Sequence, residues 1–284
     1  MTSNQLLQQF VMTDKDFERI RGWIREETGI KISDAKRQMV YARLTKRLRA
    51  LGYTQFKDYL DYLESDERDN ELVNFKNAIT TNLTSFFREP HHFDFLEKQA
   101  FAEIRARALK GAREIRIWSA GCSTGQEAYS IAATIDKCFP KRVGWDIRIL
   151  ATDIDTNVLQ EAKQAIYPVE KLKDLDDVQR ENIFETVQGD TSVLRVKSHL
   201  RQMVVFNQLN LMAPEWPIKR MFDLIFCRNV MIYFDKPTQH QLVSRYWSLL
   251  KENGYLLLGH SESLFGLNTR YRLVGKNIYQ KIED

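Results

Sequence analysis

The segment Ile117-Trp118-Ser119-Ala120-Gly121-Cys122-Ser123-Thr124-Gly125-Gln126-Glu127-Ala128-Tyr129-Ser130 decides the fold of most of this chain. An apolar, strand-like run leads into a loop of small residues, and a helical run follows. Gly121 and Gly125 permit a tight turn and let a ligand approach the backbone closely. The third glycine of the dinucleotide pattern G-x-G-x-x-G is missing, which disfavours a pyrophosphate at the helix N-terminus. The segment predicts a strand, a ligand-binding loop and a helix.

A carboxylate ends the next strand-like run, Ala151-Thr152-Asp153-Ile154-Asp155. Asp153 follows Gly125 by 28 residues, and in doubly wound folds an acidic residue at this place accepts hydrogen bonds from ribose hydroxyls. The alternative is that Asp153 or Asp155 caps the helix that follows. A ligand that has a ribose and no phosphate suits both segments, and S-adenosylmethionine is such a ligand.

Strand-like and helical runs alternate around these two segments, which predicts a parallel sheet covered on both faces. We predict strands at residues 115–119, 147–152, 203–207, 222–227 and 255–259, helices at 125–138, 156–165 and 237–250, and a final antiparallel edge at 272–281. Two β-rich runs, 184–187 and 192–196, flank the turn signal Gln188-Gly189-Asp190. They predict a small antiparallel insertion.

The first ninety residues are predicted to be helical, and a linking helix follows near 92–110. Thr13 and Asp16 can form a capping box, and Gly29 can end that first helix. A second helix, 34–51, has an apolar stripe and ends at Gly52; the stripe consists of Val40, Leu44, Leu48 and Leu51. This helix carries six bases, whereas residues 58–71 carry seven acids. Neighbouring helices therefore present opposite charge.

Composition excludes several classes of protein. Apolar residues make up 43% and charged residues 28% of 284 residues, which excludes a disordered or collagen-like chain and suits two domains. The start has no basic region followed by an apolar run, so we expect a cytoplasmic protein. Three cysteines without C-x-x-C spacing predict reduced, mostly buried thiols rather than disulfides or a zinc site.

Four segments together resemble the chemotaxis receptor methyltransferases, the CheR family. They are Thr81-Asn82-Leu83-Thr84-Ser85-Phe86-Phe87-Arg88-Glu89, the stretch from Trp118 to Ser130, Asp153-Ile154-Asp155, and Phe226-Cys227-Arg228-Asn229-Val230-Met231-Ile232-Tyr233-Phe234. The likeness covers nearly the whole chain in the expected order.

The resemblance implies an α/β fold. A helical N-terminal domain (1–90) and a linking helix (91–112) would precede a Rossmann-like methyltransferase domain (113–284) with a β-subdomain at about 170–206. It also implies a monomer that transfers methyl groups from S-adenosylmethionine to glutamates on cytoplasmic helices of chemoreceptors, without membrane insertion, and releases S-adenosylhomocysteine. The implied cofactor-binding residues are Asn82, Thr84, Arg88, Glu127, Asp153, Asn210, Leu211, Arg228 and Asn229.

Methylation of a carboxylate needs little acid-base help. A glutamate of pKa about 4.3 is ionised near neutral pH, so catalysis comes mainly from positioning in a dry pocket. Arg88 and Tyr233 are the candidate catalytic residues, because a guanidinium and a phenol can hold carboxylates without removing a proton. The alternatives are a surface salt bridge of Arg88 with Glu89 and simple core packing of Tyr233.

The basic helix is the candidate substrate-binding surface, through Arg43, Lys46, Arg47 and Arg49. Its core stripe lies on the opposite side, which leaves these cations free for acidic receptor helices. A nucleic-acid methyltransferase is the rival function, yet the expected loop for a flipped base is absent, and we expect no nucleic-acid partner. A silent cofactor-binding adapter is the other rival.

Two further features bear on ligands and partners. His91 and His92 are adjacent and would point about 100° apart on a helix, so we predict a solvated pair and no metal. The turn around Gly189 has few glycines, and this favours an enzyme that does not need a tethering peptide from the receptor.

Overall fold

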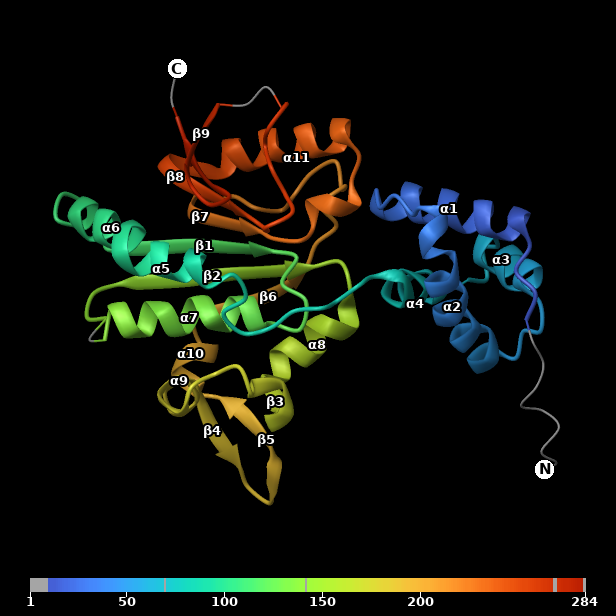
Figure 1. Ribbon diagram of the computed structural model, residues 1–284, viewed down its shortest axis with the longest axis horizontal. Helices are drawn as coiled ribbons and strands as arrows, with labels where there is room; N and C mark the ends of the chain where they lie inside the picture. Colours follow the sequence, from blue (N-terminus) through green and yellow to red (C-terminus); the bar gives the residue numbers. More distant parts are fainter. Residues whose placement is uncertain (1–9, 69, 141, 268–269, 283–284) are drawn as a thin grey trace. The chain divides into compact units, whose positions relative to one another are not determined.

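The computed structural model describes residues 10–68, 70–140, 142–267 and 270–282. The chain divides into two compact units, one ending at Thr81 and the other beginning at Asn82 (Figure 1). The segment 91–112, for which a linking helix is predicted, belongs to the second unit. Among the described helices, none has both the length and the apolar character required to cross a membrane.

The first unit is helical, as predicted. Its α-helices are α1 (Asp14–Thr28), α2 (Arg37–Leu51), α3 (Phe56–Glu64) and α4 (Glu71–Ile79), with a 3-10 turn at Asp34–Lys36. The capping box of Thr13 and Asp16 is confirmed. Gly29 and Gly52 end α1 and α2 in the left-handed conformation, with φ of 73° and 77°.

The apolar stripes of these helices form one core. Val40, Leu44 and Leu48 of α2 are fully buried, but Leu51 is 41% exposed. The prediction for Leu51, the last residue of α2, is therefore wrong. The prediction that the basic helix and the acidic residues 58–71 are neighbours of opposite charge is confirmed, since Nε of Arg47 in α2 donates to Oε1 of Glu71 in α4 at 3.0 Å.

The second unit contains a seven-stranded sheet in the order β6-β2-β1-β7-β8-β10-β9. Its strands are β1 (Glu114–Ala120), β2 (Asp146–Asp153), β6 (Val204–Gln208), β7 (Phe222–Cys227), β8 (Leu250–Leu258), β9 (Tyr271–Gly275) and β10 (Ile278–Lys281). The first five are parallel, and β10 is antiparallel to β8 and β9. The predicted antiparallel edge is thus a hairpin of two strands.

Helices cover both faces of this sheet (Figure 1). One face packs beneath α5 (Pro90–Phe95), a π-helical turn (Leu96–Ala100), α6 (Phe101–Ala108), α7 (Gln126–Cys138) and α8 (Thr156–Gln164). The other packs beneath α11 (Lys236–Leu249). Alternation along β1 explains the division, because Ile117 lies in the first core and Trp118 in the second.

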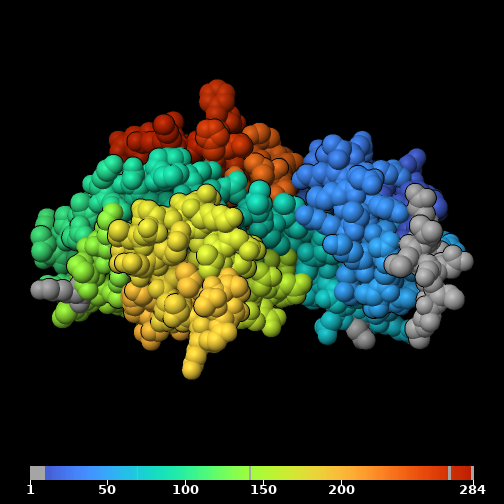
Figure 2. All heavy atoms as spheres, turned by 60° about the horizontal axis from the view of Figure 1, so that its bottom comes forward, coloured from blue at the N-terminus to red at the C-terminus, as the bar shows by residue number. Residues whose placement is uncertain are grey.

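The predicted antiparallel insertion is present as a sheet in the order β3-β5-β4. Its strands are β3 (Ile166–Pro168), β4 (Phe184–Val187) and β5 (Asp190–Val196), accompanied by a 3-10 turn (Val169–Leu172), α9 (Asp177–Ile183) and α10 (Ser198–Arg201). The hairpin of β4 and β5 projects from the surface of the second unit (Figure 2). Its base is anchored in the core, where the ring of Phe184 packs edge-on against Phe86.

Candidate active site

The loop after β1 is held in a shape that only small residues permit. Gly121 has φ of 95°, and its N–H donates to the carbonyl of Thr152 at 2.8 Å. A Cβ at Gly121 would lie 2.4 Å from Cγ2 of Val230, in the loop after β7. Real Cβ atoms do not approach that closely, so only glycine fits at this position. The backbone of the loop after β1 therefore packs directly against the Val230 side chain of the loop after β7, at the carboxyl ends of the two strands. This is where doubly wound folds bind their ligands.

Asp153 fastens the same loop to the end of β2. Its Oδ2 accepts the Ser123 N–H at 2.8 Å and its Oδ1 accepts the Asp155 N–H at 3.0 Å. Burial raises the pKa of Asp153 above its ordinary value. Asp155 instead caps α8, accepting the N–H groups of Asn157 and Val158. The capping alternative is therefore confirmed for Asp155.

The segment after Thr81 lies against this loop within the second unit. Asn82 donates from Nδ2 to Oδ2 of Asp155 at 2.8 Å, and its carbonyl accepts from the Ser123 hydroxyl at 3.1 Å. Arg88 donates from Nη1 to the carbonyl of Leu83 at 2.9 Å. No ion pair of Arg88 occurs among the described residues, so the surface salt bridge with Glu89 is not formed.

Arg228 is the central buried cation of the site. Its Nη1 lies 3.5 Å from Oε2 of Glu127, its Nε lies 3.5 Å from Oε2 of Glu89, and its Nη2 donates to the carbonyl of Arg88. The Ser119 hydroxyl donates to Oε1 of Glu127 at 2.6 Å. Burial raises the pKa of Glu127, and the guanidinium of Arg228 opposes that rise. Glu127 and Arg228 thus link α7 to the end of β7.

Glu262 is a site residue that no sequence pattern predicts. Its carboxylate accepts the N–H groups of Gly259 at 2.6 Å, Asn229 at 2.8 Å, Val230 at 2.8 Å and Ile232 at 3.2 Å. It thereby joins the loops after β7 and β8. A lone glutamate four residues beyond the end of β8 has no sequence signature, so only its place shortly after Gly259 could have drawn attention to it.

The remaining predicted residues lie on the segments that leave the sheet. Asn210 and Leu211 follow β6, where Leu209 donates its N–H to the carbonyl of Asp153 at 2.9 Å. Tyr233 lies half-buried in the 3-10 turn Met231–Tyr233 after β7, and Thr84 lies half-buried in the loop before α5.

These residues form a cradle at the carboxyl edge of the sheet that suits a small ligand with a ribose. Three features meet there: the close packing at Gly121, the carboxylate of Asp153, and the ion pair of Arg228 with Glu127. Comparison with known proteins is in agreement. The family described as "CheR methyltransferase, SAM binding domain" matches residues 82–280, and its all-alpha domain matches residues 15–80. The chain belongs to the CheR methyltransferase family. The cofactor of this CheR protein is S-adenosylmethionine.

Curated relatives of the CheR protein carry the name chemotaxis protein methyltransferase. That of Escherichia coli K12 is 43% identical over 99% of this chain and 95% of its own length. Chemotaxis protein methyltransferase 2 of Pseudomonas aeruginosa is 42% identical, covering 96% and 95%. The relative from Borreliella burgdorferi is 39% identical, covering 90% of each chain.

Two cations of the basic helix are not free in the CheR protein, contrary to expectation. Arg43 donates to the carbonyls of Ile79 and Thr80 at the end of α4, at 2.8 and 2.6 Å. Arg47 donates from Nε to Oε1 of the buried Glu71 at 3.0 Å. Their side chains lie beside α4, where they satisfy terminal carbonyls and a buried carboxylate.

The histidine prediction also needs correction, because His92 is fully buried in the CheR protein. The Nε2 atoms of His91 and His92 lie 3.2 and 3.3 Å from the carbonyl of Lys276. Glu89, His91 and His92 bring possible ligand atoms within 4.8 Å of one another. The guanidinium of Arg228, 3.5 Å from Glu89, repels any cation there. The free cysteines are as expected, with Cys122 and Cys227 buried.

The burial of His92 gives the CheR protein a defined pH response. Burial lowers the pKa of His92 from 6.5 to about 3. Below pH 6.5 the unfolded chain binds a proton at this residue and the folded chain does not, so stability falls as pH drops from 6.5 towards 3. We expect a loss of about 2 kcal/mol at pH 5. Urea unfolding at pH 7 and pH 5 should show this loss in wild type and in His260→Gln, whose histidine is exposed. If His92→Gln lost as much free energy of unfolding between pH 7 and pH 5 as the wild type, His92 would not be the source of the pH response.

Proposed function

We propose that this CheR protein methylates glutamate side chains on the cytoplasmic helices of chemoreceptors, giving methyl esters, and that it acts in the cytoplasm. The names of the curated relatives support the receptor as substrate. The observation that carries the glutamate specificity is that the two largely buried acids of the site, Asp153 and Glu127, both have partners. Asp153 is occupied by backbone N–H groups, and Glu127 by Ser119 and Arg228. Neither is free to act as a base, and an ionised glutamate needs none.

The cofactor supplies a methyl group bound to a positively charged sulfur. Asp153 is suited to the ribose hydroxyls because it ends β2 next to the glycine loop. We propose the predicted residues as the holding set: Asn82, Thr84, Arg88, Glu127, Asp153, Asn210, Leu211, Arg228 and Asn229. Within this set, Glu127 and Arg228 form an ion pair, and Arg228 also donates to the carbonyl of Arg88 in the loop before α5. Asn82 and Asn229 are tied to Asp155 and Glu262.

We propose that the basic helix α2 binds the substrate, and that its cations have two different roles. Lys46 and Arg49 of α2 are exposed and would meet the acidic receptor helix. Arg43 and Arg47 would shape the surface by fixing α2 to α4.

The test of the function uses radiolabelled S-adenosylmethionine and membranes containing chemoreceptors. We expect label in the receptor band that is released as methanol at alkaline pH, because esters hydrolyse there and N-methyl groups do not. The control is receptor whose methylation-site glutamates are replaced by alanine, which should take up no label. Base-stable label, or label in added RNA instead of receptor, would overturn the proposal.

Arg88 and Tyr233 are proposed to position the incoming carboxylate as one unit. We expect Arg88→Ala and Tyr233→Phe each to lower kcat by about tenfold, the loss of roughly one hydrogen bond, and to weaken cofactor binding by a smaller factor. The double variant should be little worse than the poorer single variant, as for residues with a shared role. Single-turnover assays with calorimetry measure both quantities. Weaker cofactor binding by Arg88→Ala, normal kcat at saturation and additive effects would show that Arg88 serves only the cofactor.

A further inference from the structure

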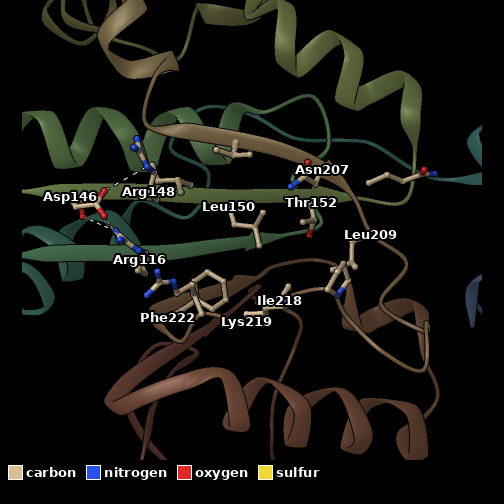
Figure 3. A pocket seen from close by; sticks show the side chains of 15 residues that line it. Arg116, Asp146, Arg148, Leu150, Thr152, Asn207, Leu209, Ile218, Lys219 and Phe222 are labelled. Carbon is tan, nitrogen blue, oxygen red and sulfur yellow. Dashed lines mark hydrogen bonds and ion pairs between the residues drawn. The ribbon is translucent and has the colours of Figure 1, made fainter.

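One part of the large sheet has no helix above it. The connection from β6 to β7, residues 209–221, contains no helix, although crossovers between parallel strands usually carry one. On the face that α11 covers elsewhere, the side chains of Leu150 and Val205 therefore lie beside an open space. Figure 3 shows Leu150 pointing into it, between β2 and the segment that carries Ile218.

This space is a cavity of about 370 Å³ on the surface of the second unit. Its floor is apolar, made by Leu150 and Val205 of the sheet together with Leu209, Ile218 and Phe222. Val205 is 47% exposed, although the neighbouring positions Val204 and Phe206 are buried on the other face. Val205 therefore adds exposed apolar surface to the floor that Leu150, Leu209, Ile218 and Phe222 form.

The rim of the cavity is basic. Four bases line it against one acid, Asp146. Two of them, Arg116 and Arg148, lie on either side of Asp146 and pair with it (Figure 3). The other two, Lys219 and Arg220, are exposed and form no ion pair among the described residues. The groove therefore attracts acidic groups.

The length of the groove suits a helix. It follows β2 from Asp146 to Thr152, six residue steps or about 20 Å. About thirteen residues of α-helix cover that distance. An amphipathic helix would place its apolar stripe on Leu150 and Val205 and its acidic flank beside Lys219 and Arg220, which is the helix-in-groove mode of recognition.

We propose that this groove, defined by the residues above, docks an acidic amphipathic helix of the chemoreceptor. The inference rests on the proposed function, since a helix that offers glutamates for methylation is acidic by its chemistry. The groove lies along the sheet face, and only its Thr152 end borders the loop of Gly121. Lys219 and Arg220 lie just before β7 begins, at the other end of that strand from Arg228. It contributes binding of the receptor and leaves cofactor binding and turnover unchanged.

The test measures binding and kinetics separately. Full-length enzyme is titrated with a soluble cytoplasmic receptor fragment, and kcat and KM are measured for the same fragment. We expect Lys219→Glu/Arg220→Glu to raise Kd and KM about tenfold at unchanged kcat and unchanged cofactor affinity. Added salt should weaken the wild type more than this variant. Val205→Trp fills the groove from an exposed position and should also raise Kd.

The matched control is Lys110→Glu/Lys163→Glu, which reverses two other exposed cations of the same unit and gives the same net charge. It should keep the wild-type Kd. Equal effects of the two charge variants, or an unchanged Kd in Val205→Trp, would overturn the groove. A wild type that binds the fragment without methylating it contradicts the proposed function alone, because the groove is then judged by Kd. A wild type that does not bind the fragment overturns both.

Discussion

Replacing Gly121 by alanine should weaken S-adenosylmethionine binding by about a hundredfold or more, a loss of roughly 3 kcal/mol. The new Cβ would stand 2.4 Å from Cγ2 of Val230, and the residue would have to keep φ of 95°. Left-handed backbone costs an alanine about 1–2 kcal/mol, and an overpacked contact costs a similar amount. The loop would move instead, and it would carry the Ser123 N–H away from Asp153. Calorimetry with the cofactor measures the effect.

Two variants separate loop displacement from backbone strain. Gly189→Ala in the β4–β5 turn has a similar φ of 82° but no atom within 4 Å of the new Cβ. It should cost some stability and leave cofactor affinity unchanged. Val230→Ala in the background of Gly121→Ala removes the clashing methyl group and should restore part of the affinity. If Gly121→Ala bound the cofactor within threefold of wild type, the proposed cradle would lie elsewhere.

Arg228→Met should lower the free energy of unfolding of the second unit by about 3–5 kcal/mol. The change leaves the carboxylates of Glu127 and Glu89, each only 12% exposed, without their cation, and an uncompensated charge so little exposed is costly. The pKa of Glu127 is already raised by burial and should rise further. Urea unfolding at neutral pH, followed by tryptophan fluorescence, measures the loss.

Glu127→Gln added to Arg228→Met removes one of the stranded charges, so the double variant should be more stable than Arg228→Met alone. Lys98→Met provides the surface control. Lys98 pairs with Asp94 at 3.4 Å, but both side chains are mostly exposed, and the loss should stay below about 1 kcal/mol. Similar losses in Lys98→Met and Arg228→Met would refute the role of the buried cation.

The sheet could be predicted from sequence because each strand is an apolar run between polar loops. The predicted limits of β7 are correct, and those of β1, β2 and β6 lie within one residue of the observed limits. Strand β8 begins at Leu250, five residues before its predicted start, because Lys251, Glu252 and Asn253 carry no strand pattern. Pairing of Leu250 with Phe222 of β7 decides where the strand begins, and a register shift between Phe222 and Leu224 accommodates the extra residues.

The site was predictable only in part. Gly121 and Asp153 stand in local patterns that predict their places. The contacts of Glu262 stand in no such local pattern, because they join segments that only folding brings together. The pairing of Arg47 with Glu71 could not be predicted for the same reason. The same holds for His92, whose ring meets the carbonyl of Lys276 and the ring of Phe226 only in the folded chain. The charge of a helix can be predicted from sequence. Whether its cations are free to bind a partner depends on the contacts they make with the neighbouring helix.

The carboxylate of Glu262 has a consequence for the timing of binding. By accepting four backbone N–H groups from two loops, it orders those loops in the protein alone. The conformational entropy of these loops is therefore lost when the chain folds, and the arriving cofactor meets a surface already in shape. Association of this enzyme with its methyl donor should accordingly proceed at a rate that loop closure does not limit.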